Sequence, residues 1–164
     1  MYALIENNAV TQVGELSILF PNTSNPTHAF AIEQGALEVV EGEQKDQRFY
    51  WVTFDKYEVT GNVVTRTYVN TPKALEDVTN EDGSITKGLK SQYISQVKQT
   101  ANSMLQPTDW TVTRKFERGI DIPLDIAAAR AAIFAECSRL EAAIAASSSV
   151  EELIAVVSAQ NWTA

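Results

Sequence analysis

The sequence has few of the residues that chemistry at an active site usually needs. Its 164 residues include one histidine, His28, and one cysteine, Cys137. A histidine without a second histidine or a nearby cysteine cannot assemble a common metal site, and a lone cysteine cannot form an intramolecular disulfide. The seven glycines are scattered, and none precedes the Lys-Ser/Thr pair of a phosphate-binding loop. These absences argue against a disulfide scaffold, a nucleotide-binding loop and a metal centre.

The remaining candidates for catalysis have simpler structural explanations. Asp121 and Asp125 come at the start of a predicted helix, where acids stabilise the helix dipole. The serines at 147–149 lack the strand-turn-helix context of a hydrolase nucleophile and have no histidine downstream. Cys137 falls on an apolar helix stripe with two acids nearby, which raises a thiol pKa. We expect no enzymatic activity, cofactor or metal; an enzyme acting on a cell-surface polymer would need reactive groups brought together from distant positions.

Long hydrophobic runs are absent as well. No stretch reaches the roughly 18 consecutive apolar residues that indicate a membrane span, and the first residues have neither the basic start nor the apolar run of a signal peptide. A chain that does not rely on disulfides also suits a reducing cytosol. We expect a soluble, unexported protein that does not bind membranes.

Positive charge is scarce, and it is unevenly distributed. The net charge is −8, but residues 84–118 carry a local excess of four positive charges. We interpret them as solvated side chains facing acidic neighbours, because they spread over a predicted helix and a following strand within an acidic protein. A phosphate-binding patch for nucleic acid is the alternative that we do not favour. The basic residues are Lys87, Lys90, Lys98, Arg114, Lys115 and Arg118.

What the sequence does contain is a change of hydrophobic period near Lys87, from strand-like alternation to helical spacing. We predict an α+β protein, with a small antiparallel β-sheet in residues 1–75 and an α-helical half in residues 87–164. Residues 76–86 are acidic, polar and contain glycine, which predicts a linker between the two domains.

Two hairpins are predicted in the N-terminal half, because β-prone runs there flank turns of asparagine and glycine that tolerate positive φ. They span residues 2–13, around Asn7 and Asn8, and residues 48–69, around Gly61 and Asn62. A short strand is predicted at 35–40, and residues 20–27 predict an ordered polar loop that extends to His28. Alternation in the second hairpin puts Trp51 on one face and Tyr50 on the other, so we expect the first part of this hairpin to be covered on both faces.

Helical spacing dominates the second half of the chain. The predicted helices are residues 89–104, which Pro107 prevents from continuing, residues 124–145, and a short last helix with a capping box of Ser149 and Glu152. Residues 110–113 are β-prone and predict a brief strand. The apolar stripes of the two long helices most simply pack on each other; the alternative is that part of a stripe is reserved for another chain.

Two parts of the sequence resemble a known family. The run Leu105 to Thr111, with the letters LQPTDWT, is followed by Arg114, Pro123 and a helix bearing Arg130, and it resembles the C-terminal region of bacteriophage tail assembly chaperones. The segments at 2–7, 20–24 and 35–40, with the hairpin through Tyr68, resemble the N-terminal region of small phage tail and tail-fibre proteins.

The resemblance implies a non-enzymatic protein that helps a trimeric tail fibre to fold, to trimerise or to attach to the tail. It implies a phage tail fibre protein as the partner, together with other tail or baseplate proteins, and work in the host cytoplasm during assembly. A permanent structural component of the tail or fibre, located in the virion, is the alternative.

Binding of this kind needs surface rather than reactive groups. Exposed strand edges of an unassembled fibre offer a place for a hairpin to pair, and apolar helix stripes can cover exposed side chains. For Trp110 the two interpretations are a core anchor between helix and strand, which we favour, and a contact with the partner. The candidate partner-binding residues are Trp110, Arg114, Trp162, Tyr93 and Trp51.

Overall fold

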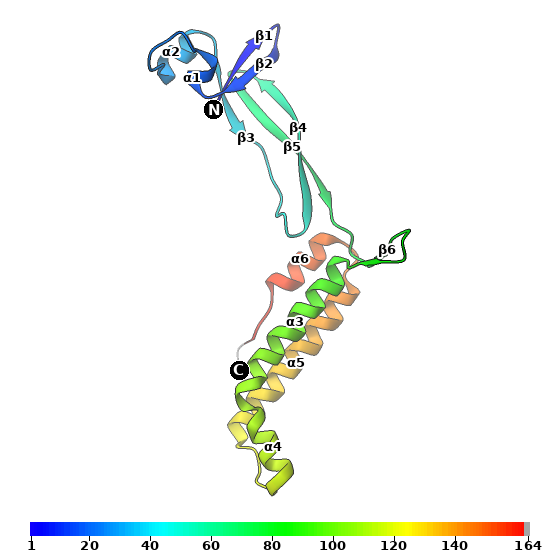
Figure 1. The fold of residues 1–164 in the computed structure, drawn as a ribbon. Helices are drawn as coiled ribbons and strands as arrows, with labels where there is room; N and C mark the ends of the chain where they lie inside the picture. Colours follow the sequence, from blue (N-terminus) through cyan, green and yellow to red (C-terminus); the bar gives the residue numbers. More distant parts are fainter. Residues whose placement is uncertain (163–164) are drawn as a thin grey trace. The chain divides into compact units, whose positions relative to one another are not determined.

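The computed structural model describes residues 1–162 and divides the chain into two compact units. Unit 1 is Met1–Thr71 and unit 2 begins at Pro72. Strands dominate the first unit and helices the second, so the predicted α+β class is confirmed (Figure 1). Residues 163 and 164, the end of the predicted helical domain, lie outside the described residues.

Unit 1 is built on a five-stranded sheet. β1 pairs antiparallel with both β2 and β3, whereas β3 and β5 run parallel, which departs from a purely antiparallel sheet. The strand order is β2-β1-β3-β5-β4, so β2 and β4 form the edges. The strands are β1 (Tyr2–Glu6), β2 (Ala9–Gly14), β3 (Leu37–Glu41), β4 (Tyr50–Thr60) and β5 (Val63–Pro72).

Both predicted hairpins form, and their turns have the expected backbone. Asn7 and Asn8 connect β1 to β2 with φ values of 50° and 62°. Gly61 has a φ of 58° in the turn between β4 and β5. Residues with positive φ match the right-handed twist of the flanking strands, which explains why these turns could be located from sequence.

Two short helices in unit 1 were missed by the sequence analysis. They are α1 (Leu16–Leu19) and α2 (His28–Glu33), so His28 begins a helix instead of ending a loop. The hydroxyl of Thr27 caps α2 by accepting a hydrogen bond from the Phe30 amide at 3.3 Å. The phenol oxygen of Tyr2 lies 2.7 Å from Nδ1 of His28.

The long hairpin is covered less fully than its sequence suggested. Phe49 and Tyr50 are buried, but Trp51 is 63% exposed and Phe54 is also exposed. A unit of this size has too few other elements to cover both faces of a long strand, so the prediction that both faces are covered is wrong beyond Tyr50.

Unit 2 is organised around a pair of long helices. α3 and α5 pack side by side through the apolar stripes that the sequence predicted (Figure 1). Leu89, Val97 and Ala101 of α3 are buried, as are the α5 residues from Ile133 to Ile144 that face it at helical spacing. The elements are β6 (Val78–Thr79), β7 (Ile85–Thr86), α3 (Leu89–Leu105), the short 3-10 helix η1 (Gln106–Thr108), α4 (Asp109–Arg118), α5 (Leu124–Ala146) and α6 (Val150–Ser158).

The segment at 76–86, predicted as a linker, is an ordered part of unit 2. Strands β6 and β7 pair within it, and the chain before them lies against the start of α3. The backbone amide of Leu89 donates to the carbonyl of Ala74, and the amide of Gly88 donates to the Asp77 carboxylate at 2.8 Å. These bonds satisfy amides at a helix start that has no capping side chain of its own.

Residues 110–113, predicted as a brief strand, belong to α4. Their β-branched and aromatic side chains favour strands, but charges at both ends favour the helix. Asp109 lies in the first turn, Lys115 and Arg118 lie in the last, and Gly119 ends the helix with a φ of 68°. Acids near the N-terminus, bases near the C-terminus and a left-handed glycine are the usual signals of helix ends.

The last helix begins where its capping box predicted. The Ser149 hydroxyl accepts a hydrogen bond from the amide of Glu152 at 3.1 Å. The Glu152 carboxylate accepts from the amide of Ser148 at 2.7 Å, one residue before the position of a standard capping box.

Candidate partner-binding surface on helix α4

The corner between α3 and α4 is held by one arginine of α5. Nη1 of Arg130 donates to the carbonyl of Leu105 at 2.9 Å and to the Thr108 hydroxyl at 2.6 Å. Nη2 of the same guanidinium lies 3.0 Å from the Asp109 carboxylate, and the Arg130 side chain is only 14% exposed. Arg130 therefore fixes the direction in which α4 leaves α3.

The Thr-Asp-Trp-Thr motif divides into structural residues and one exposed residue. Thr108 and Asp109 bind Arg130, and Thr111 is fully buried with its hydroxyl donating to the carbonyl of Thr108 at 2.7 Å. Trp110, in contrast, is 57% exposed. The interpretation of Trp110 as a core anchor is wrong, because the buried position in this turn of α4 is taken by Thr111.

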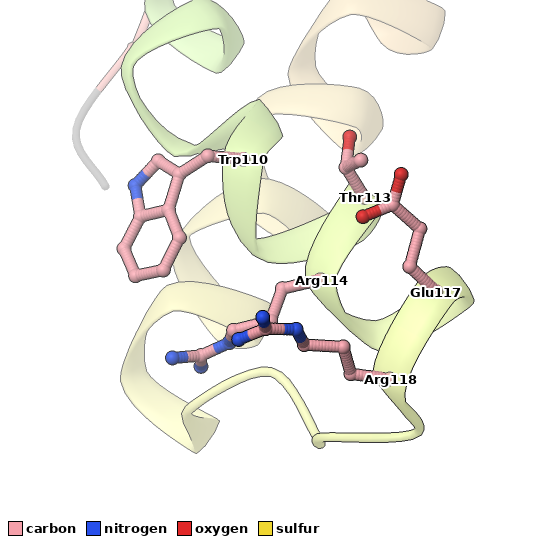
Figure 2. Close-up of a pocket in the computed structure, with 5 residues that line it drawn as sticks. All are labelled: Trp110, Thr113, Arg114, Glu117 and Arg118. Atoms are coloured by element: carbon pink, nitrogen blue, oxygen red, sulfur yellow. The ribbon is translucent and has the colours of Figure 1, made fainter.

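Three side chains share one face of α4. Trp110, Arg114 and Arg118 are spaced four residues apart, which places them in one row along a helix. The Arg114 guanidinium carbon lies 4.8 Å from the centre of the Trp110 ring, a cation–π distance. Figure 2 shows Arg114 and Arg118 reaching toward the side of α4 that carries the indole, while Thr113 and Glu117 lie on the other side.

These residues line an open hollow of about 400 Å³. Its lining consists of Trp110, Thr113, Arg114, Glu117 and Arg118, which supply one aromatic ring, two guanidinium groups, a hydroxyl and a single carboxylate (Figure 2). We call Trp110, Arg114 and Arg118 the α4 binding face. Such a surface offers an aromatic plane for stacking and guanidinium hydrogen-bond donors.

The two arginines of this face differ from the other arginines of the chain in that they lack a carboxylate partner in the described structure. Among residues 1–162, Arg114 and Arg118 form no ion pair with a carboxylate, although the chain carries 21 acids. The other four arginines all do so: Arg48 with Asp46, Arg66 with Glu41, Arg130 with Asp109 and Arg139 with Glu136. The α4 binding face is thus a locally positive spot on an acidic protein.

α4 also exposes apolar side chains that are not part of the lining of the hollow. Phe116 is 92% exposed, and Val112, one turn before it, is exposed as well. Leu124, at the start of α5, is also exposed. Val112 and Phe116 are four residues apart on a helix and so are neighbours, and exposed apolar patches are typical of surfaces that contact another protein.

The other predicted binding residues are not among those that line the hollow. Tyr93 is half-buried on α3, and Trp162 follows α6, where its indole nitrogen donates to the side chain of Gln160 at 2.8 Å. Trp51 lies on β4 in unit 1. Of the five predicted residues, the structure brings together Trp110 and Arg114. Arg118 is a further candidate that was not predicted from the sequence, and its four-residue spacing from Trp110 becomes a signal once the segment is known to be a helix. The structural role of Arg130 was not predicted either.

Strand β4 provides a second candidate surface, in unit 1. It stands at an edge of the sheet, with β5 as its one sheet neighbour in the described chain. Phe54 is exposed on this strand, and its ring lies 5.0 Å from that of Tyr57. A long edge strand with exposed aromatic side chains is suited to pairing with a strand of another chain.

Three of the six basic residues in the basic stretch of the sequence form ion pairs with nearby acids. Ion pairs join Lys90 to Glu76 at 2.5 Å, Lys98 to Glu141 at 2.9 Å and Lys115 to Asp121 at 3.1 Å. Among the described residues, Lys87, Arg114 and Arg118 are the basic residues of this stretch that form no ion pair, and the two arginines share one helix face.

The reactive side chains named from sequence have structural surroundings. Cys137 is buried, and its thiol donates to the Glu141 carboxylate at 3.3 Å. Burial first, and then this hydrogen bond, raise the pKa of the Cys137 thiol. Within residues 1–162, no three His, Cys, Asp or Glu side chains gather as a metal site would need. None of the helices described has the length and apolar character to cross a bilayer.

Comparisons with models of protein families, with curated proteins and with solved structures found no match to this chain.

Proposed function

We propose that this protein is a bacteriophage tail fibre assembly chaperone, which binds the fibre protein and aids its folding, trimerisation or attachment to the tail without catalysis. Its partner is a fibre protein that becomes trimeric, with other tail or baseplate proteins as further contacts. It acts in the host cytoplasm during assembly. The proposal joins the resemblance of residues 105–130 and of the N-terminal half to the surfaces described above.

The observation that carries the proposal is the exposed Trp110 with Arg114 stacked on it at 4.8 Å. Tryptophan and arginine are the residues most enriched at the energetic centres of protein interfaces. Arg130 holds the helix that presents them, so part of the ordering cost is met before the partner arrives.

The β4 edge supports the same role from unit 1. Fibre proteins are rich in strands and expose unpaired backbone groups until their subunits assemble. A temporary strand partner would satisfy those groups and delay aggregation, and β4 is a strand of eleven residues at a sheet edge.

The test is co-expression of this chain with the fibre protein of the same phage. The fibre alone should be insoluble or fail to trimerise, and the chain should restore trimers that are visible on a gel. The Trp110→Ala variant should restore few trimers, whereas Thr113→Ala, which changes a neighbouring side chain of the hollow, should act like the unaltered chain. A fibre that trimerises equally well alone would show the proposal to be wrong.

A permanent component of the tail or fibre is a second candidate. The apolar side of α4 around Phe116 favours it, because a surface so exposed is usually covered in a lasting assembly. Mass spectrometry of purified virions distinguishes the two roles: a permanent component is present at a fixed copy number, and a chaperone is absent.

A further inference from the structure

We propose that the α4 binding face recognises an acidic segment of its polypeptide partner, with two carboxylates set against Arg114 and Arg118 and an apolar side chain against Trp110. This inference rests on the proposed function, since it names the chemistry of the partner at that site.

Charge is the first argument. Arginines in this chain are otherwise matched to carboxylates, and the two on this face have none among residues 1–162 despite the excess of acids. The Nε atom of Arg114 is covered by protein atoms and meets no acceptor in the described chain, so the terminal nitrogens of its guanidinium are the ones that a ligand meets. Paired N–H groups of guanidinium match the two oxygens of a carboxylate.

Spacing is the second argument. Residues four apart on a helix are separated by about 6 Å along its axis. Side chains two residues apart on the same face of a β-strand are separated by roughly 6.5 Å. Two acids at positions i and i+2 of an extended segment therefore fit Arg114 and Arg118 in register, and a fibre rich in strands offers such segments.

The surroundings favour a polypeptide over a nucleic acid. Glu117 lines the same hollow, and the whole chain carries a net charge of −8, which repels a long polyanion. Trp110 supplies an apolar plane that a leucine or aromatic side chain can cover. A short acidic segment meets the two guanidinium groups without bringing a continuous row of phosphates against the acidic surface.

The test uses the full-length protein and three fluorescein-labelled probes. The first is a twelve-residue Ser/Thr-rich peptide with one leucine and two glutamates at i and i+2, the second is the same peptide with glutamines, and the third is a single-stranded DNA of twelve nucleotides. Fluorescence anisotropy should show the glutamate peptide binding at least about tenfold more tightly than either other probe. The preference should weaken as salt is raised.

Variants of the arginines test whether the α4 binding face is responsible for the preference for the glutamate peptide. Arg114→Gln with Arg118→Gln should weaken binding of the glutamate peptide by at least about tenfold, and Arg118→Gln alone by a smaller factor. Lys115→Gln, on the same helix but paired with Asp121, should change binding by less than about twofold. Circular dichroism melts should be alike, because the two arginines make no ion pair with a carboxylate of the described chain.

Four results would overturn the inference: equal binding of the glutamine peptide, equal or tighter binding of the DNA, no loss in the double variant, or a wild-type dimer in sedimentation that the double variant abolishes. The last would make a second copy of this chain the occupant. Fibre co-expression separates the two proposals. If the double variant still restores trimers, acid recognition is wrong and the chaperone role stands; if the wild-type chain does not restore them, the chaperone role is wrong whatever the peptides show.

Discussion

Arg130 of α5 and Asp109 of α4 lie 3.0 Å apart, from Nη2 to the carboxylate oxygen, across a corner that the same guanidinium also ties to Leu105 and Thr108. The arginine is 21 positions beyond the acid in the chain, so the pair is a tertiary contact and not a local one. It orients the first turn of α4, where Trp110 is exposed. The exposed tryptophan thus depends on a nearly buried arginine.

The first prediction concerns this corner. Arg130→Leu should lower the free energy of unfolding of unit 2 by about 2 kcal/mol, because it removes the hydrogen bonds of a nearly buried guanidinium to the Leu105 carbonyl and the Thr108 hydroxyl, and its ion pair with Asp109. Urea denaturation followed by circular dichroism measures it. Arg118→Leu, an exposed arginine on the neighbouring helix, should change stability by less than about 0.5 kcal/mol. Equal losses in the two variants would show that Arg130 does not hold the corner.

The second prediction separates stability from binding at Trp110. A buried tryptophan replaced by alanine typically loses about 3–5 kcal/mol, but Trp110 is 57% exposed. Trp110→Ala should therefore cost less than about 1 kcal/mol in urea denaturation while reducing recovery of fibre trimers. Thr111→Val, at the buried position beside it, removes the hydroxyl that donates to Thr108 and should cost more stability than Trp110→Ala. The reverse order would restore the core-anchor interpretation.

Much of the fold could be predicted where local signals agree, and the prediction failed where they conflict. The helix predicted at 124–145 was found at Leu124–Ala146, because alanine-rich sequence and an apolar stripe agree there. The helix at Asp109–Arg118 was missed because its Trp-Thr-Val-Thr run favours strands, and the end signals at Asp109 and Gly119 were not weighed against it.

The candidate site was only partly predictable for a related reason. Large apolar side chains are buried in most folds, so sequence alone favours a core position for Trp110. Its exposure follows from the contact between Arg130 and Asp109, which no short window of sequence contains. The pairing of Trp110 with Arg114 could be proposed from their types, but their shared face required knowing that the segment is a helix.

The third prediction concerns Gly88, where the backbone of residues 75–76 passes the start of α3. A Cβ placed on Gly88 would lie 2.3 Å from the carbonyl oxygen of Glu76 and 2.4 Å from that of Leu75. Gly88→Ala should therefore destabilise unit 2 by about 2 kcal/mol or more, because backbone must move. Gly14→Ala, whose Cβ would meet only side-chain atoms at 3.4 Å or more, is the control and should cost much less in the thermal melt. Equal effects would mean that residues 74–77 do not lie against α3.

The fourth prediction is a pH dependence. Glu136 accepts two hydrogen bonds from Arg139 and one from the Asn161 amide, and these hold its pKa below the ordinary glutamate value, the Arg139 bonds contributing most. A carboxyl whose pKa is lower in the folded state contributes stability above its unfolded pKa of about 4.3 and loses it as pH falls further. The melting temperature of unit 2 should therefore fall as pH decreases from about 5 toward 3.

Glu136→Gln should make that fall smaller. The melting temperature should still fall somewhat with pH, because two other carboxyl groups also have a lowered pKa. Hydrogen bonds lower it for Asp77, chiefly the one from Ser91, and for Glu152, chiefly the one from the Ser148 amide. Glu117→Gln is the control, because the Glu117 carboxylate makes no hydrogen bond or ion pair with a described residue. A Glu136→Gln profile that matches the unaltered protein would contradict the assignment.

The fifth prediction concerns the reactivity of Cys137. Thiolate is the form that alkylates, and both burial and the hydrogen bond to Glu141 raise the pKa of this thiol, which lowers the fraction of thiolate relative to a free cysteine. Iodoacetamide should modify Cys137 in the folded protein at least about tenfold more slowly than in urea, as followed by mass spectrometry.

Glu141→Gln should speed the folded-state reaction by removing the negative charge, whereas Lys98→Gln, which removes the cation paired with Glu141, should slow it further. Rapid labelling of the folded protein would mean that the α3–α5 interface opens around Cys137, and the stripe would then be available to another chain.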